Sequence, residues 1–211
     1  MKKILLTTAL MLGVAAPVMA DETRLGFHAD TREVGGLDVN TYGLMLEGRQ
    51  NDFTYEAFLG TGDIDDVDMD VFSGKAMWTP WHVSHAVSVG PALSYENISI
   101  DGVGDTDMKW VGVGMVAEMG PYFMHADLMG EVDNFDDDFT ISAGLDQRLN
   151  RDWTVTSDVR YVEFGASDMT EVKAGARYNF SKSVYGNFGV SANSVNGDEG
   201  VGAFAGLGMR F

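Results

Sequence analysis

Apolar residues recur at every second position along most of the chain after residue 21. The run Tyr122, Met124, Ala126 and Leu128 is one example. The chain closes in the same rhythm, on Val201, Ala203, Ala205, Leu207, Met209 and Phe211. Side chains that alternate with a period of two belong to β-strands, and no stretch shows a competing helical spacing. The pattern therefore predicts an all-β protein.

The alternation divides into twelve candidate strands of about ten residues, with ten strands as the alternative count. Their ranges are 22–31, 39–48, 53–61, 71–79, 84–96, 108–118, 122–132, 139–149, 153–163, 170–180, 184–193 and 201–211. Pro91 falls inside the fifth strand, where a closed sheet has no free edge, so we expect a bulge there.

The connections between these strands alternate in character. After the even-numbered strands they are brief, at 49–52, 80–83, 120–121, 150–152 and 181–183. After the odd-numbered strands from the third onward they are longer and acidic, at 62–70, 97–107, 133–138, 164–168 and 194–200. The five long connections hold 15 Asp or Glu and no Lys or Arg. Two chemically different ends predict an up-and-down antiparallel meander, which an even strand number allows to close into a barrel.

The charged residues of the strands fall on the face opposite the apolar one. They are Arg24, Asp30, Glu47, Glu56, Lys75, Glu96, Glu118, Asp127, Glu131, Asp146, Arg148, Asp158, Arg160, Glu171, Lys173, Arg177 and Arg210. Lys109 and Glu163 depart from this rule, and both lie at strand ends. A charge near the midplane of a bilayer costs a barrel about 2–4 kcal/mol, so a charge-free face suits hydrocarbon. A soluble secreted barrel uses the same period with the opposite sense, and alternation alone leaves both open.

Aromatic residues favour the membrane. One set gathers beside the short connections: Phe53, Trp78, Trp81, Tyr122, Trp153, Tyr178, Phe180, Tyr185 and Phe211. A second set lies toward the acidic connections: Phe27, Tyr42, Phe72, Tyr95, Phe139 and Tyr161. Two such girdles are typical of transmembrane β-barrels, in which tilted strands of about ten residues cross the apolar band.

The last strand ends at Phe211, with Met209 and Leu207 on its apolar face. In these features the sequence resembles small porin-like bacterial outer-membrane β-barrel proteins, whose terminal aromatic residue is recognised by the outer-membrane assembly machinery. The resemblance covers residues 21–211 and points to no narrower family. It implies a closed antiparallel transmembrane barrel in contact with outer-membrane lipid and lipopolysaccharide.

The N-terminal segment is predicted to be a signal peptide. Lys2 and Lys3 precede an apolar stretch over 4–16, and the small-residue pattern Val18-Met19-Ala20 precedes Asp21. This is the layout of a secretory signal that is cleaved near Ala20. The remaining residues, 21–211, are expected to form one barrel domain in the bacterial outer membrane.

Composition narrows the function. The net charge is −18, and without the two lysines of the signal segment the remaining 12 basic and 32 acidic residues leave −20. Such an acidic chain is not expected to bind nucleic acid, because binding to phosphates needs Lys and Arg. The absence of Cys excludes disulfides, thiolate metal sites and thiol catalysis.

The interior of the expected barrel carries small residues and two walls of charge. Many inward positions are Gly or Ser, which leaves room for water, although paired Arg and Glu side chains could also close the gap. One wall is mostly acidic, with Glu47, Glu56, Glu96, Glu118, Asp127 and Glu131. The other is more basic, with Arg24, Arg148, Arg160, Lys173, Arg177 and Arg210. Facing walls of opposite charge resemble the constriction of general porins, with ordinary cross-strand pairing as the alternative.

The acidic connections are candidate sites for divalent cations. Asp63, Asp65, Asp66, Asp68 and Asp70 could hold Ca²⁺ or Mg²⁺ loosely, and such ions could bridge them to lipopolysaccharide phosphates. The Gly and Glu of an EF-hand loop are missing, so a solvated run of charge is the competing interpretation. No metal site and no cofactor is predicted.

Enzymatic chemistry is not predicted. His125, Asp127 and Ser142 are expected to face the interior, and a Ser/His/Asp grouping is conceivable there. Ordinary polar residues of a barrel interior explain them equally well. The sequence thus predicts a small channel for passive diffusion of hydrophilic solutes or ions. The alternatives are a non-conducting structural or surface-interaction barrel, and a soluble secreted barrel that binds an apolar ligand.

Overall fold

The computed structural model describes residues 22–132 and 138–211, so the expected signal peptide at 1–20 and most of the 133–138 connection lie outside the described residues. Twelve long strands and one strand of two residues make up nearly all of the described chain. They are β1 (Glu22–Val34), β2 (Leu37–Gln50), β3 (Phe53–Ile64), β4 (Val67–Trp78), β5 (Trp81–His82), β6 (Val87–Ile100), β7 (Gly104–Met119), β8 (Tyr122–Glu131), β9 (Phe139–Arg148), β10 (Trp153–Phe164), β11 (Ser167–Asn179), β12 (Val184–Val195) and β13 (Asp198–Arg210). The predicted all-β class and the count of twelve long strands are confirmed.

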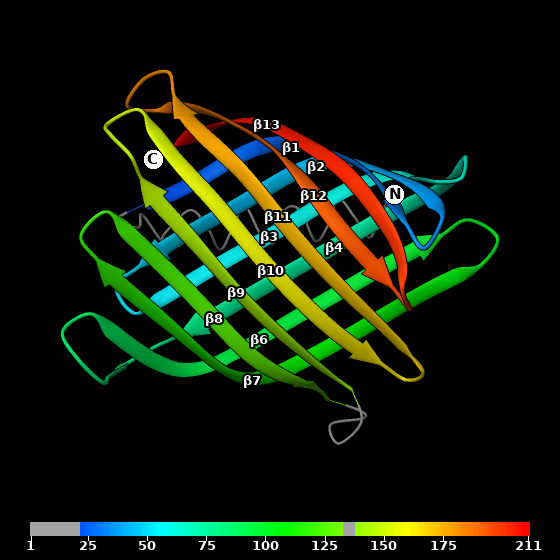
Figure 1. Cartoon of the computed structure of the whole chain (residues 1–211), viewed down its shortest axis with the longest axis horizontal. Coiled ribbons are helices and arrows are strands. Elements are labelled where there is room, and N and C mark those ends of the chain that lie inside the picture. The colour runs from blue at the N-terminus through cyan, green and yellow to red at the C-terminus, as the bar shows by residue number, and fades with distance from the viewer. Residues whose placement is uncertain (1–21, 133–137) are drawn as a thin grey trace.

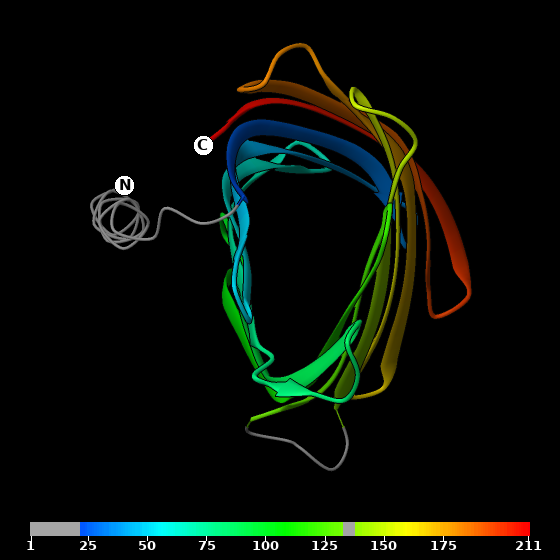
Figure 2. The same cartoon turned by 90° about the vertical axis from the view of Figure 1, so that its left-hand side faces the viewer.

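The strands form one antiparallel sheet in which each long strand pairs with its neighbours in the chain. β1 pairs with β13 from Arg24–Arg210 to Arg32–Gly202, and β4 pairs with β6, so the sheet closes on itself. The tilted strands of Figure 1 form the closed oval ring of Figure 2. This is the predicted up-and-down barrel. No helix in the described part of the chain is long and apolar enough to cross a membrane.

The acidic connections differ from the prediction, because most of their residues extend the strands. The expected loop 62–70 is a hairpin in which β3 and β4 pair up to Ile64–Val67, leaving Asp65 and Asp66 as a two-residue turn. Both turn residues have positive φ, as do Gly35 and Gly36, and this backbone matches the right-handed twist of a β-hairpin. Period-two alternation continues through the acidic sequence, so its charge does not mark a loop.

The irregularity expected at Pro91 is present but lies in the opposite strand. Pairing of β4 with β6 ends at Met77–Ala92, and pairing of β5 with β6 begins at Trp81–Val89. Three residues, 78–80, therefore face two, 90–91. Thr79 leaves the ladder and donates from its backbone N to the Asp52 carbonyl oxygen at 2.7 Å. The strand that contains Pro91 stays in unbroken register with β7 and begins at Val87, not at residue 84.

The two faces of the wall differ as predicted. Large apolar side chains are exposed on the outside, among them Leu128, Val155 and Leu207. The alternate residues carry the charges, and their ion pairs pass through the barrel interior. One assignment was wrong: Tyr185 of the expected girdle is buried inside, with its ring 5.8 Å below the Arg177 guanidinium.

Candidate functional site

Several ion pairs join strands that are not neighbours in the sheet, and such pairs can meet only through the barrel interior. Arg160 of β10 pairs with Glu96 of β6, four places away in the sheet order. Lys75 of β4 pairs with Asp127 of β8, three places away. Because residues opposite each other in a ladder share a face, the register then places every residue of the two predicted walls inside the barrel.

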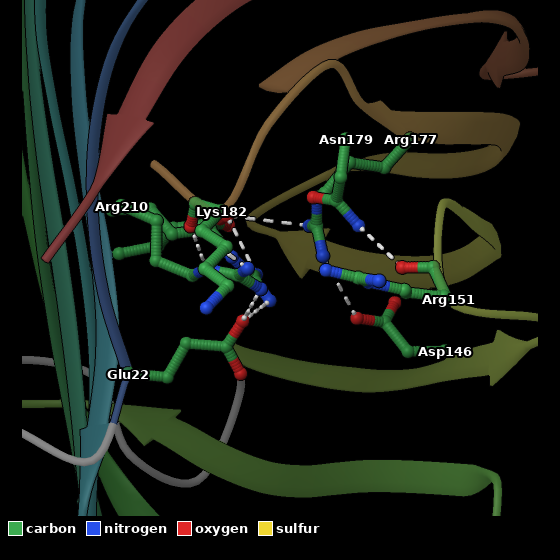
Figure 3. A network of polar contacts seen from close by, with 9 residues as sticks. Glu22, Asp146, Arg151, Arg177, Asn179, Lys182 and Arg210 are labelled. Carbon is green, nitrogen blue, oxygen red and sulfur yellow. Dashed lines mark hydrogen bonds and ion pairs between the residues drawn. The ribbon is translucent and has the colours of Figure 1, made fainter. Parts of the chain in front are cut away.

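The widest crossing is made by Arg177. Its Nη2 lies 3.2 Å from Glu47 Oε1 on β2, and its Nη1 lies 3.5 Å from Asp146 Oδ2 on β9. β2 and β9 are six places apart in a ring of twelve long strands, so they are opposite walls. We call Glu47, Arg177 and Asp146 the transverse chain. It spans the interior near the end of the barrel where β1 begins and β13 ends, and Figure 3 shows Arg177 beside Asp146.

Further contacts hold the transverse chain in place. Arg24 Nη1 donates to the same Glu47 oxygen at 2.9 Å, and Arg24 also pairs with Glu22. Arg210 lies 3.4 Å from Glu22 Oε1 and donates from Nη2 to the Lys182 carbonyl oxygen at 2.9 Å. Figure 3 shows this second group beside the first. Acidic and basic side chains therefore alternate around this end of the interior.

The two predicted walls do contact one another. Arg24 and Arg177 of the basic wall pair with Glu47, and Arg160 pairs with Glu96. Glu118 pairs instead with Arg49, which lies in β2 and not in the predicted connection 49–52. Lys75 and Asp127 pair within the acidic side. Two further residues of these ion pairs, Glu22 and Arg32, were not predicted. Arg32 lies beyond the predicted end of the first strand at residue 31, and Glu22 is the first residue of that strand.

Part of the interior is apolar and closed to water, which differs from the predicted polar interior. Met77, Ala92, Trp110, Val116, Met129 and Val162 form a buried cluster. Trp110 is 1% exposed although it occupies an inward position opposite Glu131. Alternation identifies a strand face from the majority of its residues. A few large apolar residues among the charged ones therefore cannot be recognised from the pattern.

Another part of the interior is open to water. Glu56 is exposed, and the side chains of Asp158 and Glu118 are 49% and 58% exposed. The inward glycines add less space than expected, because neighbours occupy it. A Cβ on Gly144 would meet Asp158 and the His125 ring, and one on Gly175 would lie 2.8 Å from the Phe204 ring. The interior therefore combines water-exposed carboxylates with an apolar filling.

The conceivable catalytic grouping is not assembled. Ser142 Oγ donates to Asp127 Oδ2 at 2.6 Å and accepts from Lys75 Nζ at 2.9 Å. His125 Nε2 instead lies 3.4 Å from Asp158 Oδ1. A nucleophilic serine needs a base that accepts its proton, with the carboxylate behind that base. Here the serine is bonded directly to the carboxylate and to a cation.

The acidic residues at the far end surround the barrel mouth. We call them the acidic rim: Glu33, Asp38, Asp63, Asp65, Asp66, Asp68, Asp70, Asp101, Asp105, Asp107, Asp138, Glu163, Asp168, Asp198 and Glu199. Asp65 Oδ1 accepts from the Asp38 amide at 2.9 Å, and Asp63 Oδ1 from the Asn40 side chain at 3.0 Å. Among the described residues, no group of three or more His, Asp or Glu has the arrangement of a metal site.

Known structures share this barrel, whereas sequence comparisons find nothing. The sequence matches no protein-family model. It matches no curated protein. The structure is similar to that of a KdgM porin, with a TM-score of 0.65 and 11% identity over 89% of this chain and 99% of that one. The chain has the fold of the small outer-membrane porins.

Two further neighbours share that porin fold. The NanC porin has a TM-score of 0.62 at 10% identity, over 88% of this chain and 98% of that one. The outer membrane phospholipase A of Escherichia coli has a TM-score of 0.57 at 10% identity, over 90% and 92%. Because one neighbour is a phospholipase, the fold alone does not separate transport from catalysis, and the chemistry of the interior has to carry that distinction.

Proposed function

We propose that the protein is an outer-membrane channel through which small hydrophilic solutes or ions diffuse. The observation that carries the proposal is the closed twelve-stranded wall, apolar outside, around an interior of ion pairs and water-exposed carboxylates such as Asp158. Hydrocarbon can surround such a wall, while charged groups line a passage. A KdgM porin, one of the neighbours, has been solved in complex with disordered oligogalacturonate, which supports solute entry into barrels of this kind.

The same wall also supports a location in the outer membrane. Exposed apolar residues cover the outside, among them Leu93, Val113 and Val190, each about three-fifths exposed. Exposure of such an extended apolar surface to water is unfavourable, which argues against the soluble secreted barrel. The proposal therefore includes contact with outer-membrane lipid and lipopolysaccharide, and delivery by an assembly machinery that reads Leu207, Met209 and Phe211. The arrangement of Ser142, His125 and Asp127 supports a protein without catalysis.

Recording from the refolded protein in a planar bilayer tests the channel. We expect discrete conductance steps, and detergent-refolded barrel without steps in any salt would contradict the proposal. Migration in detergent gels that changes on heating would show that the protein tested is the folded barrel.

A non-conducting barrel is the second candidate, and one observation favours it. Trp110 and Thr140 point into the barrel and are each 1% exposed, so packing excludes water around them. The same bilayer recording separates the two candidates, because a folded barrel without conductance supports the second.

A further inference from the structure

The transverse chain crosses the proposed path of solutes, so a solute that passes beside it can exchange contacts with its charged groups. Removing one partner of an ion pair that is largely shielded from water leaves an uncompensated charge, which is costly. A cation can compensate Glu47 or Asp146 but leaves Arg177 unpaired. An anion can compensate Arg177 but leaves the two carboxylates. A molecule with both charges can compensate both sides at once.

The contacts of the chain are loose enough to exchange. Charge-assisted hydrogen bonds between N and O are commonly about 2.7–2.9 Å long. The two contacts of Arg177 are longer, at 3.2 Å to Glu47 and 3.5 Å to Asp146. The bonds from Arg24 and Arg177 to Glu47 both fall on Oε1, which leaves Oε2 for an ammonium group.

Arg177 also carries a donor that has no acceptor. The residue is 8% exposed, and its Nε has no hydrogen-bond partner. A buried unsatisfied donor is unfavourable, and guanidinium binds a carboxylate through two parallel bonds. A solute carboxylate on the edge that includes Nε would satisfy this atom, while the ammonium of the same solute meets Glu47 or Asp146.

The barrel mouth adds a bias against anions. The acidic rim surrounds the entrance at the other end, and its negative potential repels net negative solutes. A net-neutral solute meets no such barrier. Resting on the proposed channel function, we propose that the preferred solutes are small zwitterions of amino-acid type, in which an ammonium and a carboxylate are carried on adjacent or nearby carbons.

The test compares two isomers of equal mass, glycine and glycolamide, of which the second carries no net or separated charge. Their entry into proteoliposomes is measured by osmotic swelling, after subtraction of swelling in liposomes without protein. We expect glycine to enter about two- to fivefold faster, because the solute replaces existing contacts and the net gain corresponds to one weak ion contact.

Two variants connect the preference to the transverse chain. Arg177→Gln should abolish the glycine preference and shift ion selectivity toward cations, because Glu47 and Asp146 are left without it. The double variant E47Q/D146N should also abolish the preference but shift ion selectivity toward anions. Lys109→Gln, on the outer surface near the rim, is the control that should retain the preference.

The outcomes separate this inference from the channel proposal. Equal entry of glycine and glycolamide through a conducting wild-type barrel would overturn the preference for zwitterions and leave the channel standing. Retention of the preference in both transverse-chain variants would also overturn it. Absence of both conductance and swelling for all solutes would contradict the channel itself.

Discussion

A charge placed on the outer wall tests the orientation on which the functional argument depends. Val113 of β7 faces outward and is 61% exposed, with Pro91 and Leu128 opposite it on the two neighbouring strands. If hydrocarbon covers this surface, Val113→Arg brings a guanidinium into the apolar band. If water covers it, the same change is nearly neutral.

The size of the effect follows from the depth of Val113. The Lys109–Tyr95 pair marks one aromatic girdle and the Met119–Tyr122 pair marks the other. The ten residue steps between them span about 33 Å along the strand, or about 23 Å along the bilayer normal at a tilt near 45°. Val113 lies four steps from the first girdle, close to the midplane. We therefore expect Val113→Arg to lower the free energy of unfolding by about 2–4 kcal/mol.

The assay is urea-dependent unfolding of the barrel refolded in phospholipid vesicles, followed by tryptophan fluorescence and heat-modifiable migration. An energy of 2–4 kcal/mol raises the unfolding equilibrium constant by about 30- to 1,000-fold. The matched control is Val103→Arg, in the 101–103 turn, where the side chain is 80% exposed and a charge should cost about 0–1 kcal/mol. Equal stability of Val113→Arg and the wild type would refute the outward apolar face, as would an equal loss in the control.

Three further predictions concern the interior and the rim. Neutralising Arg160, Lys173 and Arg177 together to Gln should shift single-channel selectivity toward cations, because Glu96 loses Arg160 and Glu47 keeps only Arg24; unchanged selectivity would remove a role for the facing walls. A spin label at Leu128 should report lipid contact and one at Glu56 should report water, and the reverse pattern would mean an inverted barrel. Equilibrium dialysis should show only screening-level calcium uptake by the acidic rim, whose carboxylates accept internal hydrogen bonds; stoichiometric uptake would establish a site.

The sequence predicted the wall well because alternation is a direct image of strand geometry. Runs such as 122–132 and 139–149 correspond closely to β8 and β9. The hairpin ends were predicted less well. Between Asp63 and Asp70 the composition favours a loop, but the chain keeps its period of two and turns at Asp65 and Asp66. Beyond the apolar band a strand needs no apolar face, so acidic residues can extend it into water.

The candidate site was predictable in its residues but not in its contacts. Charge on the inward face identified Glu47, Asp146 and Arg177 without a structure. Which of them meet depends on the oval cross-section and on the tilt of the strands, and neither is written in local sequence. Trp110 shows the same limit, because its burial comes from Met129 and Val162 on other strands.

We expect the barrel wall to open first at the register change between β4 and β6. Pro80 and Pro91 remove amide protons from both sides of this join. Thr79, with bonds from its amide and its hydroxyl to the Asp52 carbonyl at 2.7 and 3.1 Å, anchors the displaced segment to the β2–β3 turn. Amide deuteration should therefore begin around Gly90, and a force pulling the ring apart should unzip it along this line.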